Sequence, residues 1–131
     1  MYNKGPKTFQ LGTGGGALNR LVKLASGLAV LNTETATDEP IGAIVGMDGP
    51  GEAGDFAAVQ FLKDDGTMQL EMAGAIDQDA DVYAAANGMG QALPATPGDY
   101  RKIGKALQAG SAAGSVIEVL PYDFHHIETV T

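Results

Sequence analysis

The chain has 131 residues, 44% of them hydrophobic, a formal net charge of −8 and no cysteine. This length fits one domain with arms, the hydrophobic content excludes a disordered chain, and the lack of cysteine excludes disulfide and thiolate chemistry. The charge is uneven, because residues 1–23 carry four bases and no acid. The remainder is strongly acidic and no hydrophobic run is long enough to span a bilayer, so we expect neither a nucleic-acid nor a membrane partner.

Short strands separated by glycine-containing turns are the elements that the sequence predicts. In chain order they cover residues 8–11, 21–24, 28–31, 41–45, 56–62, 67–72, 82–86, 103–107 and 116–120. Residues 18–25 also fit helical spacing, which leaves that stretch open between a strand and a short helix. We expect residues 1–7 to form an N-terminal arm and residues 121–131 a C-terminal tail. The loops predicted between strands include residues 12–16, 47–54 and 90–99.

The two halves of the chain repeat one another. Four stretches recur in the same order at offsets of 59 to 62 residues, namely 8–11 with 67–70, 22–27 with 82–88, 40–44 with 102–106 and 53–59 with 113–119. Short strands at spacings of roughly 8–12 residues indicate an all-β barrel or sandwich. We therefore predict a β-barrel domain over residues 8–120, in which repeats 8–62 and 67–120 close against each other. At most one short helix is expected.

The motifs that could carry catalysis or bind a ligand are all incomplete. Residues 12–17 fit the pattern G-x-G-x-x-A, but no βαβ alternation follows them. The pair at 104–105 lacks the first glycine and the hydroxyl residue of a phosphate-binding loop. The adjacent histidines at 125–126 point in opposite directions on an extended segment, and the aspartates at 77–81 lack the glutamate of a calcium loop. We expect a protein that is not an enzyme, with no catalytic residue, metal or cofactor.

Candidate contact residues lie near both ends of the chain. The basic side chains of the first 23 residues could bind an acidic protein surface or could be solvated. The hydrophobic side chains beyond the last predicted strand could pack on their own body or on a neighbour. These candidates are Lys4, Lys7, Phe9, Arg20, Tyr122, Phe124 and Ile127.

The order of the repeated stretches resembles a family of small virion proteins of tailed phages, the capsid cement or head decoration proteins, which are sometimes labelled phage recombinases. The stretches that carry the resemblance are 9–11, 21–27, 37–42, 73–76, 81–83, 103–107 and 113–120. It covers roughly residues 8–120. The recombinase label lacks support, since the sequence has no phosphate-binding loop and its body is acidic.

The resemblance implies a β-barrel-like structural protein on the outer surface of the virion capsid. Its partners would be the major capsid protein, whose neighbouring subunits it would bridge and stabilise, and further copies of itself, in a trimer rather than a dimer. The family has no catalytic residues to carry over. The alternative is a binding module associated with a phage tail or fibre.

Overall fold

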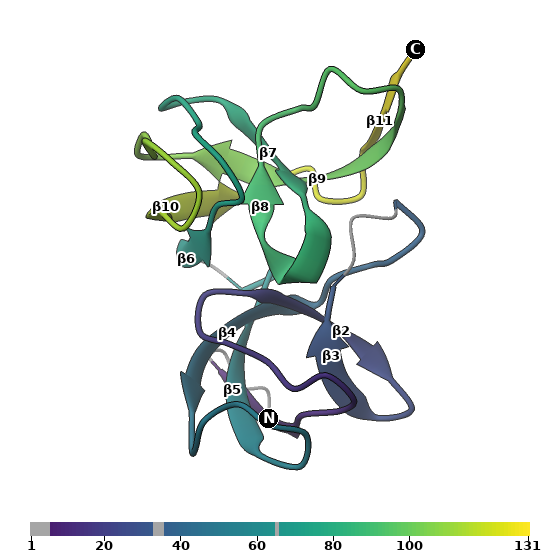
Figure 1. Ribbon diagram of the computed structural model, residues 1–131, viewed down its shortest axis with the longest axis vertical. Coiled ribbons are helices and arrows are strands. Elements are labelled where there is room, and N and C mark those ends of the chain that lie inside the picture. The colour runs from purple at the N-terminus through teal and green to yellow at the C-terminus, as the bar shows by residue number, and fades with distance from the viewer. Residues whose placement is uncertain (1–5, 33–35, 65) are drawn as a thin grey trace.

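The chain is all-β and forms two antiparallel sheets, one from each half, in the computed structural model, which describes residues 6–32, 36–64 and 66–131 (Figure 1). The first sheet contains β1 (Lys7–Gln10), β2 (Leu21–Ala25), β3 (Leu28–Leu31), β4 (Gly42–Met47) and β5 (Phe56–Phe61). The second contains β6 (Met68–Glu71), β7 (Asp81–Ala84), β8 (Gly90–Gln91), β9 (Gly98–Ala106), β10 (Val116–Pro121) and β11 (Ile127–Val130). A single 3-10 turn, Ala86–Gly88, is the helical element of the described residues. The all-β prediction is confirmed.

The two sheets have the same strand order, which confirms that the sequence repeat is a structural repeat. The first sheet runs β1-β5-β4-β2-β3 and the second runs β6-β10-β9-β7-β8, with β11 paired to β9. Equivalent residues are fixed by the pairing, because Val22 lies opposite Gly42 in the first sheet and Val82 lies opposite Gly104 in the second. These equivalences have offsets of 60 and 62 residues, as the sequence comparison predicted.

The prediction that both halves close into one barrel is wrong. In each half the first strand pairs with the last strand of the same half, as shown by Phe9 opposite Ala57 and Leu70 opposite Ile117. Each half therefore completes its own sheet. The sheets curl, and only one parallel bridge in each half links the end of the first strand to the third strand, so the described residues form no closed barrel. These bridges are Leu11 to Ala29 and Met72 to Gly90.

Three hydrophobic side chains of the first half join the two sheets. Leu21, Ala43 and Leu62 are buried in the core of the second half rather than in that of the first, and we call these three residues the joining face. Leu21 can do so because neighbouring residues of a strand point to opposite faces, and the adjacent Val22 fills the core of the first half. The two halves are consequently packed into one body.

Hydrogen bonds between backbone groups of the two halves, and one ion pair between side chains, reinforce the joining face. The Glu71 N–H donates to the Asn19 carbonyl and the Gly88 N–H donates to the Asn32 carbonyl, each at 2.8 Å. Arg20 forms an ion pair with the Glu71 carboxylate at 3.2 Å. Loops of one half therefore satisfy backbone groups of the other, which fixes their relative position.

The structure differs from the predicted elements in several places. The stretch 18–25 contains β2 and not a helix, and the first repeat match is displaced by two residues, since Phe9 corresponds to Leu70 and not to Met68. A two-residue shift keeps every side chain on the same face, so the hydrophobic pattern cannot detect it.

The predicted loop 90–99 contains β8 and the start of β9. The predicted tail contains the end of β10 and all of β11, and Lys7 of the predicted arm belongs to β1.

Candidate binding surface

An open groove with a volume of about 390 Å³ lies between the first half and the C-terminal segment. Hydrophobic side chains line most of it, namely Phe9, Leu24, Ile41, Phe61, Leu62 and Phe124. Polar side chains also line it, namely Glu39, Lys63, Arg101 and His125. We refer to this feature as the groove. A concave hydrophobic surface with a few polar groups is the usual form of a binding site.

The aromatic part of the groove comes from strands at opposite ends of the first half in the sequence. The rings of Phe9 on β1 and Phe61 on β5 meet edge to face, with centroids 6.1 Å apart and planes at 65°. This geometry is favourable for aromatic pairs because the positive edge of one ring faces the negative face of the other. Leu24 on β2 is 49% exposed. The groove thus combines a fixed aromatic pair with a hydrophobic side chain open to contact.

Arg101 on β9 supports the polar side of the groove. Its side chain is only 7% exposed, and its Nε and Nη2 donate to the Ala36 carbonyl at 3.1 and 2.7 Å. The Nη2 atom also lies 3.9 Å from the Glu39 carboxylate. The guanidinium therefore holds the chain before β4 against β9, and its charge is balanced in part by Glu39.

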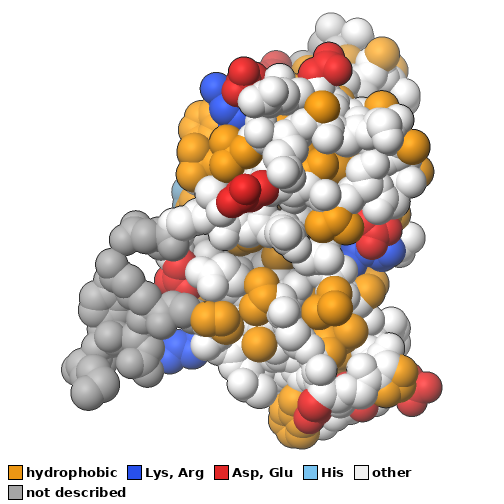
Figure 2. Space-filling view, turned by 90° about the vertical axis from the view of Figure 1, so that its left-hand side faces the viewer, with side chains coloured by type: hydrophobic (Ala, Val, Ile, Leu, Met, Phe, Trp, Pro, Cys, Tyr) orange, Lys and Arg blue, Asp and Glu red, His pale blue; other side chains and the backbone are white. Residues whose placement is uncertain are grey.

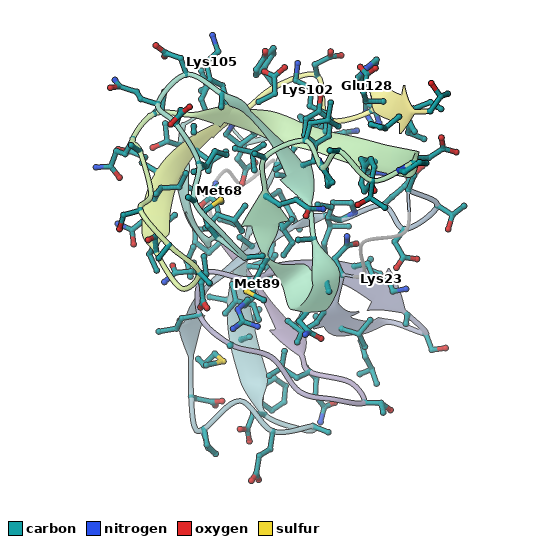
Figure 3. The ribbon with its side chains drawn as sticks, turned by 45° about the horizontal axis from the view of Figure 1, so that its top comes forward. Lys23, Met68, Met89, Lys102, Lys105 and Glu128 are labelled. Carbon is teal, nitrogen blue, oxygen red and sulfur yellow. The ribbon has the colours of Figure 1, made fainter. Side chains whose placement is uncertain are left out.

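A second polar cluster surrounds Lys102 at the end of the second half that points away from the first (Figure 3). The Lys102 Nζ donates to the Tyr122 hydroxyl at 3.0 Å and lies 4.2 Å from the centre of that ring. The carboxylates of Asp81 and Asp123 are 3.5 and 3.8 Å from the same nitrogen. The Tyr122 hydroxyl in turn donates to Asp81 at 3.1 Å. This cluster ties the start of the C-terminal segment to β7 and β9.

The Lys102 cluster predicts a loss of stability at alkaline pH. The hydrogen bond with Tyr122 raises the pKa of Lys102 above its ordinary value, and burial raises the pKa of the Tyr83 hydroxyl. Groups with a raised pKa in the folded state stabilise the fold below about pH 10, and this contribution is lost as the pH rises through the folded pKa values. We expect the free energy of unfolding, measured with urea, to fall from about pH 10 upwards.

The substitution Lys102→Met separates this effect from general alkaline denaturation. Its stability should be lower than wild type at neutral pH and should fall less steeply at alkaline pH, because the raised lysine pKa is gone. Lys105→Met, on the same strand, is the control and should retain the wild-type slope. Equal slopes for Lys102→Met and wild type would contradict the assignment.

The sequence-predicted contact residues fall into four places. Phe9 and Phe124 are brought together in the groove, whereas Lys7 and Ile127 are exposed on β1 and β11. Arg20 and Tyr122 serve internal contacts, the first with Glu71 and the Asn87 carbonyl and the second with Lys102. Lys4 lies outside the described residues.

Sequence reasoning missed Leu24, Ile41, Phe61 and Arg101 as parts of one surface. The first three lie in predicted strands, where the hydrophobic pattern does not distinguish a core residue from one that lines a groove. A comparison of equivalent positions between the repeats could have found Leu24 and Phe61, because their counterparts Ala84 and Pro121 are smaller. Nothing in the sequence marks Arg101.

The glycine-rich stretch 12–17 leads into strand β2 and not into a helix, unlike a dinucleotide-binding turn. In the part of the chain that the structure describes, no three His, Asp or Glu side chains gather in an arrangement that could hold a metal ion. The same part contains no helix with the length and hydrophobicity needed to cross a membrane.

Comparisons with protein-family models, curated proteins and solved structures gave no match to this chain.

Proposed function

We propose that this protein is a virion structural protein of the capsid cement type. It binds the outer surface of the major capsid shell, bridges neighbouring capsid subunits and acts as a homo-oligomer, a trimer rather than a dimer. The observation that carries the proposal is that one body displays an exposed hydrophobic side chain at equivalent positions of its two halves, Phe56 and Val116. A bridging protein needs at least two contact points, and the resemblance of the repeated stretches to cement proteins agrees with this use.

The capsid contacts are exposed hydrophobic side chains on the strands, one in each half. Phe56 at the start of β5 is 49% exposed and Val116 at the start of β10 is 43% exposed. They are equivalent, because Phe56 lies opposite Gln10 and Val116 lies opposite Glu71. The repeat therefore displays a hydrophobic side chain at the same position of each half. Figure 2 shows hydrophobic side chains distributed over both halves on one side of the molecule.

Weak contacts at two equivalent positions suit a surface made of repeated subunits. When two sites on one body engage together, the second contact forms at a high effective concentration, so the overall affinity exceeds that of either site. Self-association would multiply the number of sites further. The rigid join between the two sheets supports this use, since it fixes the spacing of Phe56 and Val116.

The proposal predicts that purified protein adds to phage capsid shells that lack it and raises the temperature at which they break. The double substitution Phe56→Asp and Val116→Asp should weaken shell binding by about 100-fold, because it removes two hydrophobic side chains from the contact. Binding would be measured by co-sedimentation with shells, and breakage by light scattering during heating.

The control for this experiment is Leu93→Asp, which alters a similarly exposed hydrophobic side chain in the loop before β9. It should bind shells like wild type. Tight binding to free DNA at physiological salt, or binding to tails or fibres in place of shells, would contradict the proposal. So would equal shell binding by the double variant and wild type.

A further inference from the structure

The groove occupies the position in the first half that is filled in the second half. The strand pairings make Phe9, Leu24 and Ile41 equivalent to Leu70, Ala84 and Ile103. The three residues of the second half are fully buried, at 0% exposure. Their counterparts in the first half line an open groove. The same structural position is therefore covered in one repeat and open in the other.

The joining face is what covers this position in the second half. Leu21, Ala43 and Leu62 belong to the same buried cluster as Leu70, Ala84 and Ile103. The first half thus inserts three hydrophobic side chains over the inward-facing residues of the second. The joining face therefore indicates which surface could cover the groove, because it covers the equivalent position of the second half.

The counterpart of the joining face is accessible at the far end of the second half. Leu21 pairs with Ala43 just as Asp81 pairs with Lys105. Leu62 follows Phe61 opposite Gly42, and Tyr122 follows Pro121 opposite Gly104. The equivalent set is therefore Asp81, Lys105 and Tyr122, which we call the end face. Its labelled member Lys105 lies at the end of the molecule in Figure 3.

The charges of the groove and the end face are complementary. The carboxylates of Asp81 and Asp123 are 41% and 58% exposed, whereas the Lys102 nitrogen between them is buried. The exposed lysine at the groove is Lys63, and Lys7 lies two residues before Phe9 on the same face of β1. Glu39 at the groove is also exposed, and Lys105 belongs to the end face. With these included, the exposed charges at the groove are two lysines and one acid, and those at the end face are two aspartates and one lysine, so the net charges of the two surfaces are opposite.

We infer that the groove receives the end face of a second copy of this chain, with Tyr122 in the place that Leu62 takes within the chain. The contact is head to tail, so each copy uses its groove for one neighbour and its end face for another. Such heterologous contacts produce a closed ring or an open filament, and not an isologous dimer. The inference rests on the proposed self-association and specifies its interface.

Two variants test the inference because a head-to-tail contact uses two different surfaces. Leu24→Glu places a charge in the groove, and Tyr122→Ala removes the aromatic ring of the end face. Each variant should sediment as a monomer in analytical ultracentrifugation at concentrations where wild type is oligomeric. An equimolar mixture of the two should form a dimer, since one intact groove and one intact end face remain. Leu93→Glu, outside both surfaces, should stay oligomeric.

Circular dichroism and thermal unfolding of each variant identify any that fails to fold. Asp123→Lys, which reverses an exposed charge beside Tyr122, is the replacement for the end-face variant in that case. A monomeric wild type would overturn the inference, as would oligomeric single variants or a mixture that remains monomeric. Shell binding is measured on the same samples. Oligomers that assemble as described but do not bind shells would reject the capsid function and retain the interface.

Discussion

Replacing Gly104 with alanine should lower the free energy of unfolding by about 3 kcal/mol. A Cβ atom at this position would overlap the carbonyl oxygen of Leu120 and the Cα atom of Pro121 on the neighbouring strand. Backbone atoms of a paired strand cannot move aside without breaking the sheet. Gly42 is the equivalent residue of the first half and would meet Gln60 and Phe61 in the same way. Gly42→Ala should therefore cause a similar loss.

The control for both glycines is Gly74→Ala. No atom lies within 4 Å of the Cβ that this change would add, and the residue is not among the glycines with a positive φ. Its stability should stay within about 0.5 kcal/mol of wild type. Urea unfolding of the three variants measures the difference. If Gly104→Ala were as stable as Gly74→Ala, the strands would not approach as closely as described.

Replacing Leu21 with alanine should lower the free energy of unfolding by about 3 kcal/mol and should weaken both halves together. The side chain is fully buried and packs in the core of the second half. Its loss leaves a cavity between the sheets. Because the joining face belongs to both halves, we expect unfolding to remain a single transition when it is followed by circular dichroism and by tyrosine fluorescence.

Leu24→Ala is the matched control, since it makes the same chemical change on the same strand. Leu24 is half exposed in the groove, so its truncation should alter stability by no more than about 0.5 kcal/mol. Equal losses for the two leucines would contradict the assignment of Leu21 to the joining face. Two separate unfolding transitions in wild type would contradict the single body.

Most of the strands could be predicted from the sequence because each has a local signal. Glycine turns and alternating hydrophobic residues placed β2, β3, β5 and β6 within one or two residues of their ends. β8 and the first part of β9 lie in a stretch rich in glycine and proline, where the pattern predicts a loop. β11 was missed because its pairing partner is that same part of β9, so neither segment is recognisable as a strand without the other.

The arrangement of the halves could not be predicted because the repeat is ambiguous about which strands pair. A repeat of five strands can form one shared barrel or two separate sheets with the same hydrophobic pattern. What distinguishes them is that Leu21 and Leu62 face away from their own core, and a sequence does not show which core a leucine enters. The groove depends on that choice. Only its Phe9 and Phe124 were identified in advance, as hydrophobic residues near the chain ends.

The pairing of the first strand with the last strand within each half has a consequence for synthesis. A chain that leaves the ribosome from its N-terminus cannot complete its first sheet until β5 has emerged, because β1 pairs only with β5 along its length. From that moment all strands of the first sheet are available for pairing, but Leu21, Ala43 and Leu62 have no second-half core to enter until β6 and β9 have been made. Nascent chains interrupted between the two halves would therefore carry an uncovered hydrophobic face, which is where premature release would lead to aggregation.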